Sequence, residues 1–370
     1  MSGVKIIISG GGTGGHVFPA IAIADELRRL RPDAELLFIG AEGRLEMKRV
    51  PAAGYRIEGL HVNGLDRKQL WKNAAVAWKA LGAVRKARKI VKEFGPDVAV
   101  GVGGYASGPT LSVCRMMGVP YLLQEQNSYA GVTNRMLAGG AKKVCVAYDG
   151  MGRFFGDDKV VLTGNPVRQD LRCEGVSQGE AREHFGLKGD VPTVLIVGGS
   201  LGSLTMNESV MSQLSLVKSS GVQFIWQTGS GYWDEIEKKL AEEGKPENVW
   251  ANSFIDDMGR AYKAADVVVS RAGACSISEL CLLGKAAILV PSPNVAEDHQ
   301  TKNAMALVKK DAALCIRDSE ARMTLVPKAV SLVRDGAERE ELERNILKLA
   351  KPDAAKDIAR EVLSLVETGN

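Results

Sequence analysis

A glycine-rich run close to the N-terminus is the first feature of this 370-residue sequence that could bind a ligand. Residues 10–16 read Gly-Gly-Gly-Thr-Gly-Gly-His, after an apolar run and before a helical stretch from Pro19 onward. Glycines let backbone N–H groups approach a ligand closely, and the start of a helix favours negative charge. Gly10, Gly12 and Gly15 also fit the G-x-G-x-x-G spacing of dinucleotide-binding proteins. A dinucleotide-dependent oxidoreductase therefore stays open, as does a tight turn without a ligand.

A histidine, His16, closes this loop at a position from which its side chain could face a ligand. The ordinary pKa of a histidine is about 6.5, so its imidazole can accept a proton from an attacking hydroxyl group. A capping or packing role is the alternative.

A second glycine loop and two polar segments lie in the other half of the chain. Residues 198–203 repeat the order of apolar run, glycine loop and helix, and neither loop continues into the Gly-Lys-Ser/Thr of a P-loop. Small residues at 272–276 leave room for a ligand at a helix start, where the Glu279 carboxylate could accept both hydroxyl groups of a ribose. Amide and imidazole groups at 298–303 could bind sugar hydroxyls. Tight turns, a helix-dipole effect and capping are the structural alternatives.

Short apolar runs alternate with helical stretches along the chain, which is typical of parallel α/β sheets. The two halves resemble each other at an offset of about 170–190 residues, so we expect two similar α/β domains. The expected strands lie at 4–8, 36–39, 98–102, 121–123 and 144–146, and then at 193–197, 224–227, 267–269, 287–290 and 313–316.

Gly-Asn-Pro at 164–166 breaks regular structure where the first series ends, and it predicts the domain boundary. We expect domains at 1–164 and 165–349. The last helical stretch, about 350–370, carries apolar residues at helical spacing. Its periodicity leaves open which domain it packs on, and a return to the first domain is one alternative.

The composition excludes several classes of protein. Apolar residues make up 45% and charged residues 25% of the chain, as in ordinary globular proteins. A net charge of +4 is too small to indicate nucleic-acid binding. The six cysteines form no C-x-x-C pair and only four histidines are present, so no structural metal site is expected. The first apolar run is too short for a secretion signal and no run approaches about 18 apolar residues, so we expect a cytoplasmic protein.

A series of short motifs resembles the MurG family of bacterial peptidoglycan glycosyltransferases. The motifs lie in order over residues 11–304, most of the chain, and jointly they are highly specific. The first half carries Gly-Gly-Thr-Gly-Gly-His-Val-Phe-Pro at 11–19 and further motifs at 103–109, 125–127, 131–134 and 164–168. The second half carries motifs at 198–200, 254–258 and 271–274, then Glu279, and 299–300 with 303–304.

The resemblance implies a GT-B fold, with two Rossmann-like, doubly wound parallel-sheet domains that face each other across a cleft. It implies transfer of N-acetylglucosamine from UDP-N-acetylglucosamine to the muramyl 4-hydroxyl group of undecaprenyl-pyrophosphoryl-N-acetylmuramyl-pentapeptide, which turns lipid I into lipid II. The implied donor-binding residues are Thr13, Gly14, Gly15, Asn127, Arg168, Ser200, Ile255, Ala274, Cys275, Ser276, Glu279, His299 and Gln300. The implied acceptor-side residues are Gly12, Tyr105 and Asn134, and the candidate catalytic residues are His16 and Glu125.

Individual roles follow from the same resemblance. Ser200 and its loop would meet the diphosphate, the Ile255 backbone the uracil, and Glu279 the ribose. His299 and Gln300 would contact the glucosamine hydroxyls. The sequence departs from residues common in the family at Leu201, Gln124 and His299, which leaves side-chain contacts there open.

The expected mechanism is a single displacement. The acceptor hydroxyl attacks the anomeric carbon of the α-linked donor with inversion, His16 accepts its proton, and backbone N–H groups with Arg168 stabilise the leaving diphosphate. The chain contains no Asp-x-Asp, so we expect no protein-bound metal and no cofactor. A related transferase with another acceptor and a nucleotide-sugar-binding protein without activity stay open.

A basic stretch at 65–92 predicts contact with the anionic cytoplasmic face of the inner membrane. It holds nine lysine and arginine residues against one acid, Asp66, ahead of residue 93. Tryptophan and basic side chains on one helical face suit an anionic lipid surface. Packing of the apolar face on the protein's own core is the alternative, and no nucleic-acid-binding motif accompanies the stretch. The expected contact residues are Trp71, Lys72, Trp78, Lys79 and Arg85.

Overall fold

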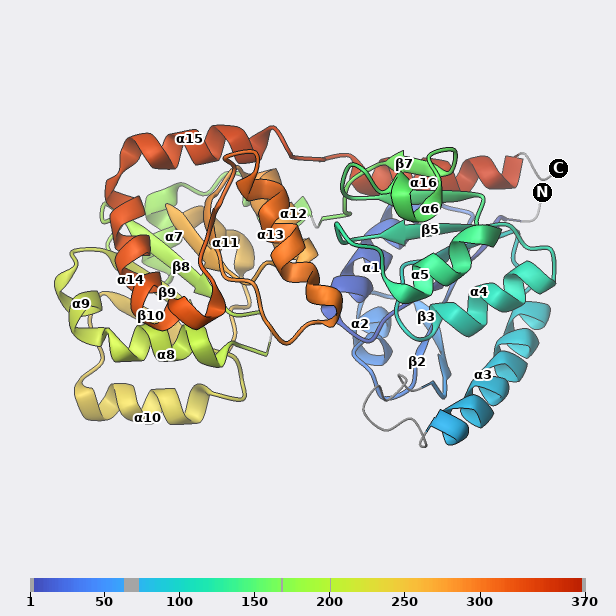
Figure 1. The fold of residues 1–370 in the computed structure, drawn as a ribbon, viewed down its shortest axis with the longest axis horizontal. Helices are drawn as coiled ribbons and strands as arrows, with labels where there is room; N and C mark the ends of the chain where they lie inside the picture. Colours follow the sequence, from blue (N-terminus) through green and yellow to red (C-terminus); the bar gives the residue numbers. More distant parts are fainter. Residues whose placement is uncertain (1–2, 63–72, 168, 200, 368–370) are drawn as a thin grey trace. The chain divides into compact units, whose positions relative to one another are not determined.

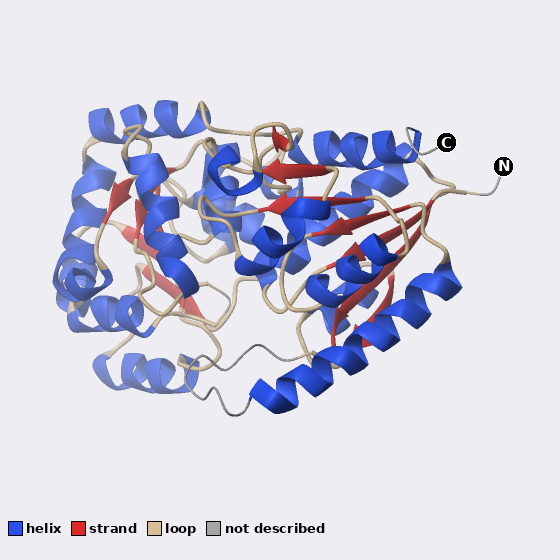
Figure 2. Ribbon diagram, turned by 45° about the vertical axis from the view of Figure 1, so that its right-hand side comes forward, coloured by secondary structure: helices blue, strands red, loops and turns tan. Residues whose placement is uncertain are grey.

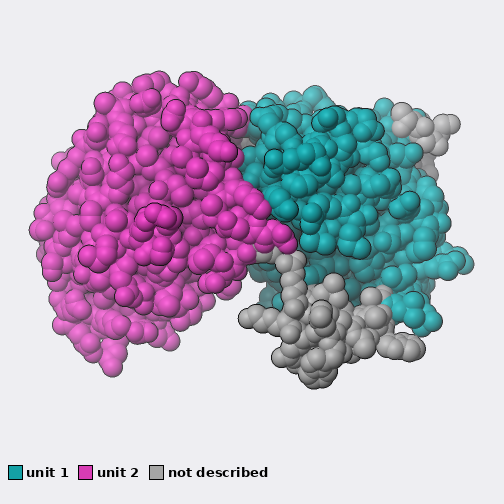
Figure 3. Space-filling view, viewed as in Figure 1, with its two compact units in different colours: residues 1–168, 351–370 teal, residues 169–350 magenta. Residues whose placement is uncertain are grey.

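The computed structural model describes residues 3–62, 73–167, 169–199 and 201–367. By their internal contacts the residues divide into two compact units (Figure 3). Unit 1 comprises residues 1–168 with 351–370, and unit 2 comprises residues 169–350. Each unit is built on one parallel sheet with helices around it (Figure 2).

Unit 1 contains a seven-stranded parallel sheet of order β3-β2-β1-β4-β5-β6-β7 (Figure 1). The chain first builds outward from β1 to β3 and then returns to place β4 on the other side of β1. Such a reversal creates a crevice beyond the carboxyl ends of the two central strands, where open α/β sheets bind ligands. The strands are β1 (Lys5–Ser9), β2 (Glu35–Ala41), β3 (Arg56–Leu60), β4 (Val98–Gly101), β5 (Tyr121–Glu125), β6 (Lys143–Val146) and β7 (Val160–Leu162).

Helices cover both faces of this sheet, because successive side chains of a strand point to opposite faces. Ile7 of β1 lies in the apolar cluster formed with α3, α4 and α5, whereas Ile6 and Ile8 lie in the cluster formed with α1, α2 and α16. The helices are α1 (Gly14–Leu30), α2 (Glu46–Ala52), α3 (Asn73–Phe94), α4 (Ser107–Met116), α5 (Val132–Leu137), α6 (Gly152–Phe155) and α16 (Ala354–Glu367).

The C-terminal helix α16 belongs to unit 1, although unit 2 precedes it in the chain. It packs against α1, and Ile358, Ala359 and Val362 are fully buried there. Lys143 at the start of β6 forms an ion pair with Glu361 of the same helix. The polypeptide therefore runs from unit 1 into unit 2 and returns to complete the first core.

Unit 2 repeats the topology with a six-stranded parallel sheet of order β10-β9-β8-β11-β12-β13. Its switch point lies between β8 and β11, the strands that correspond to β1 and β4. The strands are β8 (Thr193–Val197), β9 (Gln223–Gln227), β10 (Val249–Asn252), β11 (Val267–Ser270), β12 (Ala286–Leu289) and β13 (Leu314–Cys315). The α-helices are α7 (Gln178–His184), α8 (Leu204–Ser212), α9 (Leu214–Ser219), α10 (Trp233–Glu243), α11 (Met258–Ala264), α12 (Ala274–Leu283), α13 (His299–Val308), α14 (Asp318–Arg334) and α15 (Gly336–Leu347).

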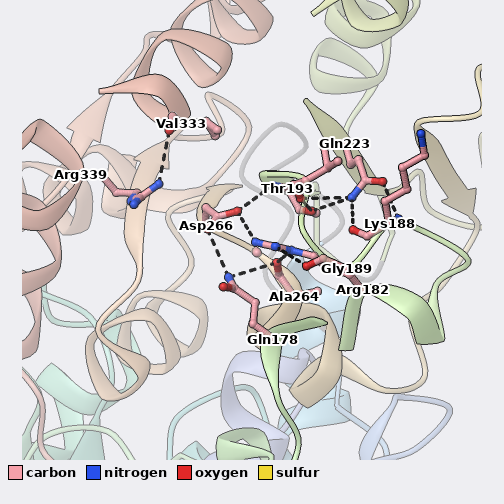
Figure 4. A network of polar contacts seen from close by, with 12 residues as sticks. Gln178, Arg182, Lys188, Gly189, Thr193, Gln223, Ala264, Asp266, Val333 and Arg339 are labelled. Carbon is pink, nitrogen blue, oxygen red and sulfur yellow. Dashed lines mark hydrogen bonds and ion pairs between the residues drawn. The ribbon is translucent and has the colours of Figure 1, made fainter. Parts of the chain in front are cut away.

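A buried polar network holds α7 against the end of the unit 2 sheet at which the central strands begin (Figure 4). Arg182 of α7 forms an ion pair with Asp266, at 2.7 Å, and donates to the carbonyl oxygens of Ala264 and Gly189. The same carboxylate accepts the N–H of Thr193, the first residue of β8. Because the network lies where β8 and β11 begin, it is at the opposite end of the sheet from the loops that follow these strands.

The ten strands expected from the sequence are all present, and β3, β7 and β10 were missed. These three lie at the edges of their sheets, where one side of the strand has no neighbour. Arg56 and Glu58 are exposed on β3, so that strand lacks the continuous apolar run of a central strand. The units divide after residue 168, where the sequence places the boundary after residue 164.

Candidate active-site residues in the two units

In unit 1, the candidate residues lie on the loops that follow β1, β4 and β5, which are neighbours in the sheet. The first glycine loop connects β1 to α1 and ends at the helix N-cap, Thr13. Gly12 has a φ of +92°, in the region that favours glycine, whereas Gly14 and Gly15 already belong to the first turn of α1. Tyr105, in the loop between β4 and α4, is exposed.

His16 lies in the first turn of α1 and is held on two sides. Its Nδ1 is 3.0 Å from the Thr13 hydroxyl oxygen, within hydrogen-bond distance. The other edge of the ring lies against Gly103, where a Cβ atom would stand 3.1 Å from both Cδ2 and Nε2. If Nδ1 carries the proton and donates to Thr13, the lone pair is on Nε2, which is the tautomer that a proton acceptor needs.

Glu125 is a buried carboxylate at the end of β5. One oxygen accepts the Asn127 N–H at 3.1 Å, and the other accepts the Gly131 N–H at 3.0 Å and the Asn134 amide at 2.9 Å. Burial raises the pKa of this carboxyl group, while these hydrogen bonds act in the opposite direction. Glu125 thus fixes the loop that carries Asn127 and Asn134.

Asn134 of α5 is 2% exposed and brings an unused acceptor to the same area. Its Nδ2 donates to the Gln124 carbonyl oxygen and to Glu125, which fixes the orientation of the amide. Its Oδ1 has no hydrogen-bond partner among the residues that the structure describes. A buried acceptor of this kind is costly, so it marks a position where a ligand hydroxyl could donate.

A chain of buried amides behind this loop includes Gln124, one of the departures from the family. Gln124 donates to the Asn165 side chain at 2.9 Å, and Asn165 donates to the Gln126 carbonyl oxygen at 3.0 Å. Gln124 is fully buried at the end of β5, so it anchors the Gly-Asn-Pro segment to the sheet.

In unit 2, the second glycine loop follows β8 and leads to α8. Gly199 and Gly202 have positive φ values of 88° and 80°, and a Cβ on Gly202 would stand 2.0 Å from the Thr228 carbonyl oxygen. The neighbouring Ser203 caps α8 by accepting the Met206 N–H. Ser200 lies outside the described residues, as does Arg168.

Gln227, at the end of β9, joins this loop to the segment after β10. The sequence motifs did not point to this residue as part of the site. Its Oε1 accepts the Ile255 N–H at 3.0 Å and its Nε2 donates to the Gly199 carbonyl oxygen at 3.0 Å. The Ile255 N–H, which belongs to the backbone predicted to contact the uracil, is therefore engaged within unit 2. The sequence could have indicated Gln227, because it is a polar residue at the end of the otherwise apolar run Phe-Ile-Trp-Gln.

Helix α12 starts directly after β11, and its N-cap Gly273 provides no side-chain cap. Its first residues, Ala274, Cys275 and Ser276, are small, which keeps the helix start accessible. Desolvation raises the pKa of the Cys275 thiol to about 12, so this group is neutral near pH 7. One turn further, Glu279 accepts a hydrogen bond from the Tyr262 hydroxyl group at 2.9 Å.

His299 and Gln300 open α13, after β12. The Gln300 Oε1 accepts the Ser292 N–H at 2.8 Å and so ties the helix start to the preceding loop. Both side chains are half-buried.

Arg271 is a second residue whose part in the site the sequence did not reveal. Its guanidinium group is ion-paired with Asp318 and donates to the Ser203 hydroxyl and the Val290 carbonyl oxygen. It therefore links the ends of β11 and β12 to the start of α8. Its position as the first residue of the motif at 271–274 was the only indication of this part in the sequence.

The predicted membrane segment is described in part. Trp71 and Lys72 lie outside the described residues, and of Trp78 and Lys79 only the backbone in α3 is described. Arg85 is exposed, whereas Ala83, Ala87 and Val91 of the same helix are buried in the unit 1 core. The described part of the chain contains no helix long and apolar enough to span a membrane. Nor do its residues include a cluster of three or more His, Cys, Asp or Glu side chains that could hold a metal ion.

Comparison with known proteins matches both units to glycosyltransferase family 28, with the N-terminal domain at residues 6–146 and the C-terminal domain at 193–358. A UDP-N-acetylglucosamine–N-acetylmuramyl-(pentapeptide) pyrophosphoryl-undecaprenol N-acetylglucosamine transferase from Bacteroides thetaiotaomicron is 56% identical over 99% of both chains. The transferase of the same name from Phocaeicola vulgatus is 58% identical over 98% of this chain and 97% of its own.

The crystal structure of MurG from Acinetobacter baumannii has a TM-score of 0.76 at 26% identity, covering 98% of this chain and 99% of that one. This similarity confirms the GT-B fold class. With more than half of its residues identical to these transferases over nearly its full length, the chain belongs to the MurG family of N-acetylglucosamine transferases.

Proposed function

We propose that this protein transfers N-acetylglucosamine from UDP-N-acetylglucosamine to the muramyl 4-hydroxyl group of lipid I and so produces lipid II for peptidoglycan biosynthesis. The observation that carries the proposal is the 56% identity, over 99% of both chains, to a transferase named for this donor and acceptor. A dinucleotide-dependent oxidoreductase is disfavoured, because the first glycine loop uses its Gly12 N–H to bind a carboxylate of the protein itself.

Unit 2 is proposed to bind the donor. The starts of α8 and α12 bring backbone N–H groups to the carboxyl ends of β8 and β11, where a diphosphate is stabilised. Glu279 would accept the ribose hydroxyls, the Ile255 carbonyl oxygen would contact the uracil, and His299 with Gln300 would bind the sugar.

Unit 1 is proposed to bind the acceptor and to take up its proton. The acceptor oxygen bonds to the anomeric carbon with inversion, while the bond from that carbon to the diphosphate oxygen breaks and its electron pair leaves with UDP. The hydroxyl proton passes to Nε2 of His16, whose Nδ1 is held by Thr13. Arg168 is proposed to stabilise the leaving diphosphate.

The proposed function is tested by measuring UDP release from UDP-N-acetylglucosamine with and without lipid I. We expect turnover only when the acceptor is present, together with a disaccharide-bearing lipid product. UDP binding without release would indicate a nucleotide-sugar-binding protein, and turnover with a different acceptor would indicate another transferase of this fold. Either result would contradict the proposed reaction.

Replacing Glu279 by alanine is expected to raise the Kd for UDP by about 100-fold or more, because two hydrogen bonds to a charged group, each contributing about 1.5–3 kcal/mol, are lost. Isothermal titration with UDP measures this change without needing the acceptor. Glu237→Ala is the matched control, since Glu237 is exposed on α10 of the same unit. An unchanged Kd for Glu279→Ala would show that the ribose is bound elsewhere.

We further propose peripheral association with the cytoplasmic face of the inner membrane through the basic stretch that includes α3. Replacing the exposed Arg85 by glutamate is expected to weaken binding to anionic vesicles by about tenfold, because each basic residue near such a surface contributes roughly 1 kcal/mol. Co-sedimentation with phosphatidylglycerol vesicles measures this, with the exposed Lys245 of unit 2 changed to glutamate as the control. Equal binding to neutral and anionic vesicles would refute the association.

A further inference from the structure

A carboxylate with no role in the proposed reaction is buried beneath the first glycine loop. Glu46, the first residue of α2, is 1% exposed. Its Oε2 accepts the Gly12 N–H at 2.8 Å and its Oε1 accepts the Ala41 N–H at 2.9 Å. Gly12 follows β1 and Ala41 ends β2, so one side chain joins the carboxyl ends of two neighbouring strands.

Two glycines provide the space that this side chain occupies. A Cβ on Gly11 would stand 2.2 Å from the Glu46 carboxyl carbon, and a Cβ on Gly40 would stand 2.6 Å from its Cγ. Contacts below 3.0 Å cannot form without a shift, so neither position accepts a larger residue while Glu46 is in place. Gly11 also has a φ of +145°, which by itself favours glycine, so its backbone conformation and the Glu46 side chain both account for this residue.

The hydrogen bond to Gly12 also determines what the loop can do. A buried carboxylate is costly unless donors surround it, so the Gly12 N–H is committed to Glu46 and faces into the protein. The Gly12 N–H is therefore used to hold the loop in place and is not available to a ligand.

The loop orients Thr13 and, through it, His16, which is the proposed proton acceptor. Gly12 is followed by Thr13, whose carbonyl oxygen accepts the His16 N–H at 3.1 Å and whose hydroxyl oxygen is 3.0 Å from the His16 Nδ1. A shift of Gly12 therefore moves the N-cap of α1 and the imidazole together.

We propose that Glu46 is a positioning residue for the transfer reaction, which holds the first glycine loop so that His16 stands at the acceptor hydroxyl. This inference rests on the proposed function, and it adds a residue that does not touch either substrate.

The first test is the kinetics of Glu46→Ala in the full-length protein with both substrates saturating. We expect kcat to fall roughly 10–100-fold, since displacing a catalytic group by about 1 Å can cost that much. The Kd for UDP, measured by titration, is expected to stay within about twofold, because unit 2 binds it. Glu58→Ala is the matched control, since Glu58 is exposed on the neighbouring strand β3. An unchanged kcat per folded molecule would overturn the proposal.

The second test is a double-mutant cycle with Gly40. Gly40→Ala alone places a methyl group against the Glu46 Cγ, so it should lower kcat as well. In the Glu46→Ala background only the Ile57 Cδ1, 3.1 Å from that Cβ, stays close, and this end of a flexible side chain can shift by a few tenths of an ångström. Gly40→Ala is then expected to change kcat by no more than about twofold. Multiplicative effects of the two substitutions would show that Gly40 does not act through Glu46, and would overturn the proposal.

The two tests distinguish this inference from the proposed function. If the unaltered protein forms no lipid II, the proposed function fails. If it forms lipid II and the Glu46 variants do so equally fast, only the positioning role fails.

Discussion

Replacing His16 by alanine is expected to lower kcat by roughly 10²–10⁴-fold, the usual contribution of a positioned general base. The Kd for UDP should stay within about twofold, because unit 2 is the unit proposed to bind the donor. The physical reason is that the acceptor hydroxyl must lose its proton as it attacks, and His16 is the proposed acceptor of that proton. Steady-state turnover with lipid I and calorimetric titration with UDP measure the two quantities.

The matched control is His61→Ala. His61 is exposed in the same unit and contacts the Glu42 carboxylate through its Nδ1, so its loss should leave kcat unaltered. Thr13→Val gives an intermediate case, because it removes the partner of Nδ1 and keeps the imidazole. We expect a loss of about tenfold from it, as for other groups that orient a histidine through its second nitrogen. If His16→Ala keeps kcat within about threefold, another group accepts the proton.

Replacing Glu125 by alanine is expected to lower kcat by about 100-fold or more and to destabilise the protein by about 3 kcal/mol. The substitution leaves the Gly131 and Asn127 N–H groups without this acceptor and removes one of the two acceptors of the Asn134 amide. Unsatisfied buried donors cost about 1–3 kcal/mol each. The loop that carries Asn127 and Asn134 then loses its fixed position, which accounts for the fall in turnover. Urea unfolding and lipid II formation measure the two effects.

Glu125→Gln separates the two roles that Glu125 could have. Glutamine keeps the shape but turns one acceptor oxygen into an amide that faces donors. If Glu125 positions the loop, turnover and stability should fall together in both variants. If it instead accepts a proton, Glu125→Gln should abolish turnover without a matching loss of stability, and the positioning role would be wrong.

The sequence predicted the two-domain α/β fold because the evidence for it is local. Buried parallel strands are continuous apolar runs, and each glycine loop directly follows one. His16 and Glu279 come soon after such strands in the sequence, so their position beyond the carboxyl ends of the strands could also be predicted.

The residues that the sequence missed depend on contacts between distant segments. Glu46 lies in the charged stretch Glu-Gly-Arg-Leu-Glu-Met-Lys-Arg, which is typical of a surface, and its burial follows from Gly11 and Gly40. Arg271 forms an ion pair with Asp318, which lies 47 residues further along the chain. In α3, Ala87 packs on the unit 1 core, as the alternative to membrane contact expected. Arg85 is exposed, and contact of this helix with a membrane stays a prediction.

The position of α16 in unit 1 has a consequence for synthesis on the ribosome. Residues 169–350 form one uninterrupted segment, so that unit can complete its core while the chain is still being made. The first unit to emerge has to wait for the last helix, which supplies Ile358 and Val362 to the face of its sheet beside α1. Unit 1 is thus translated first and completed last, and a chain that stops before residue 354 would leave the part of that face beside α1 uncovered.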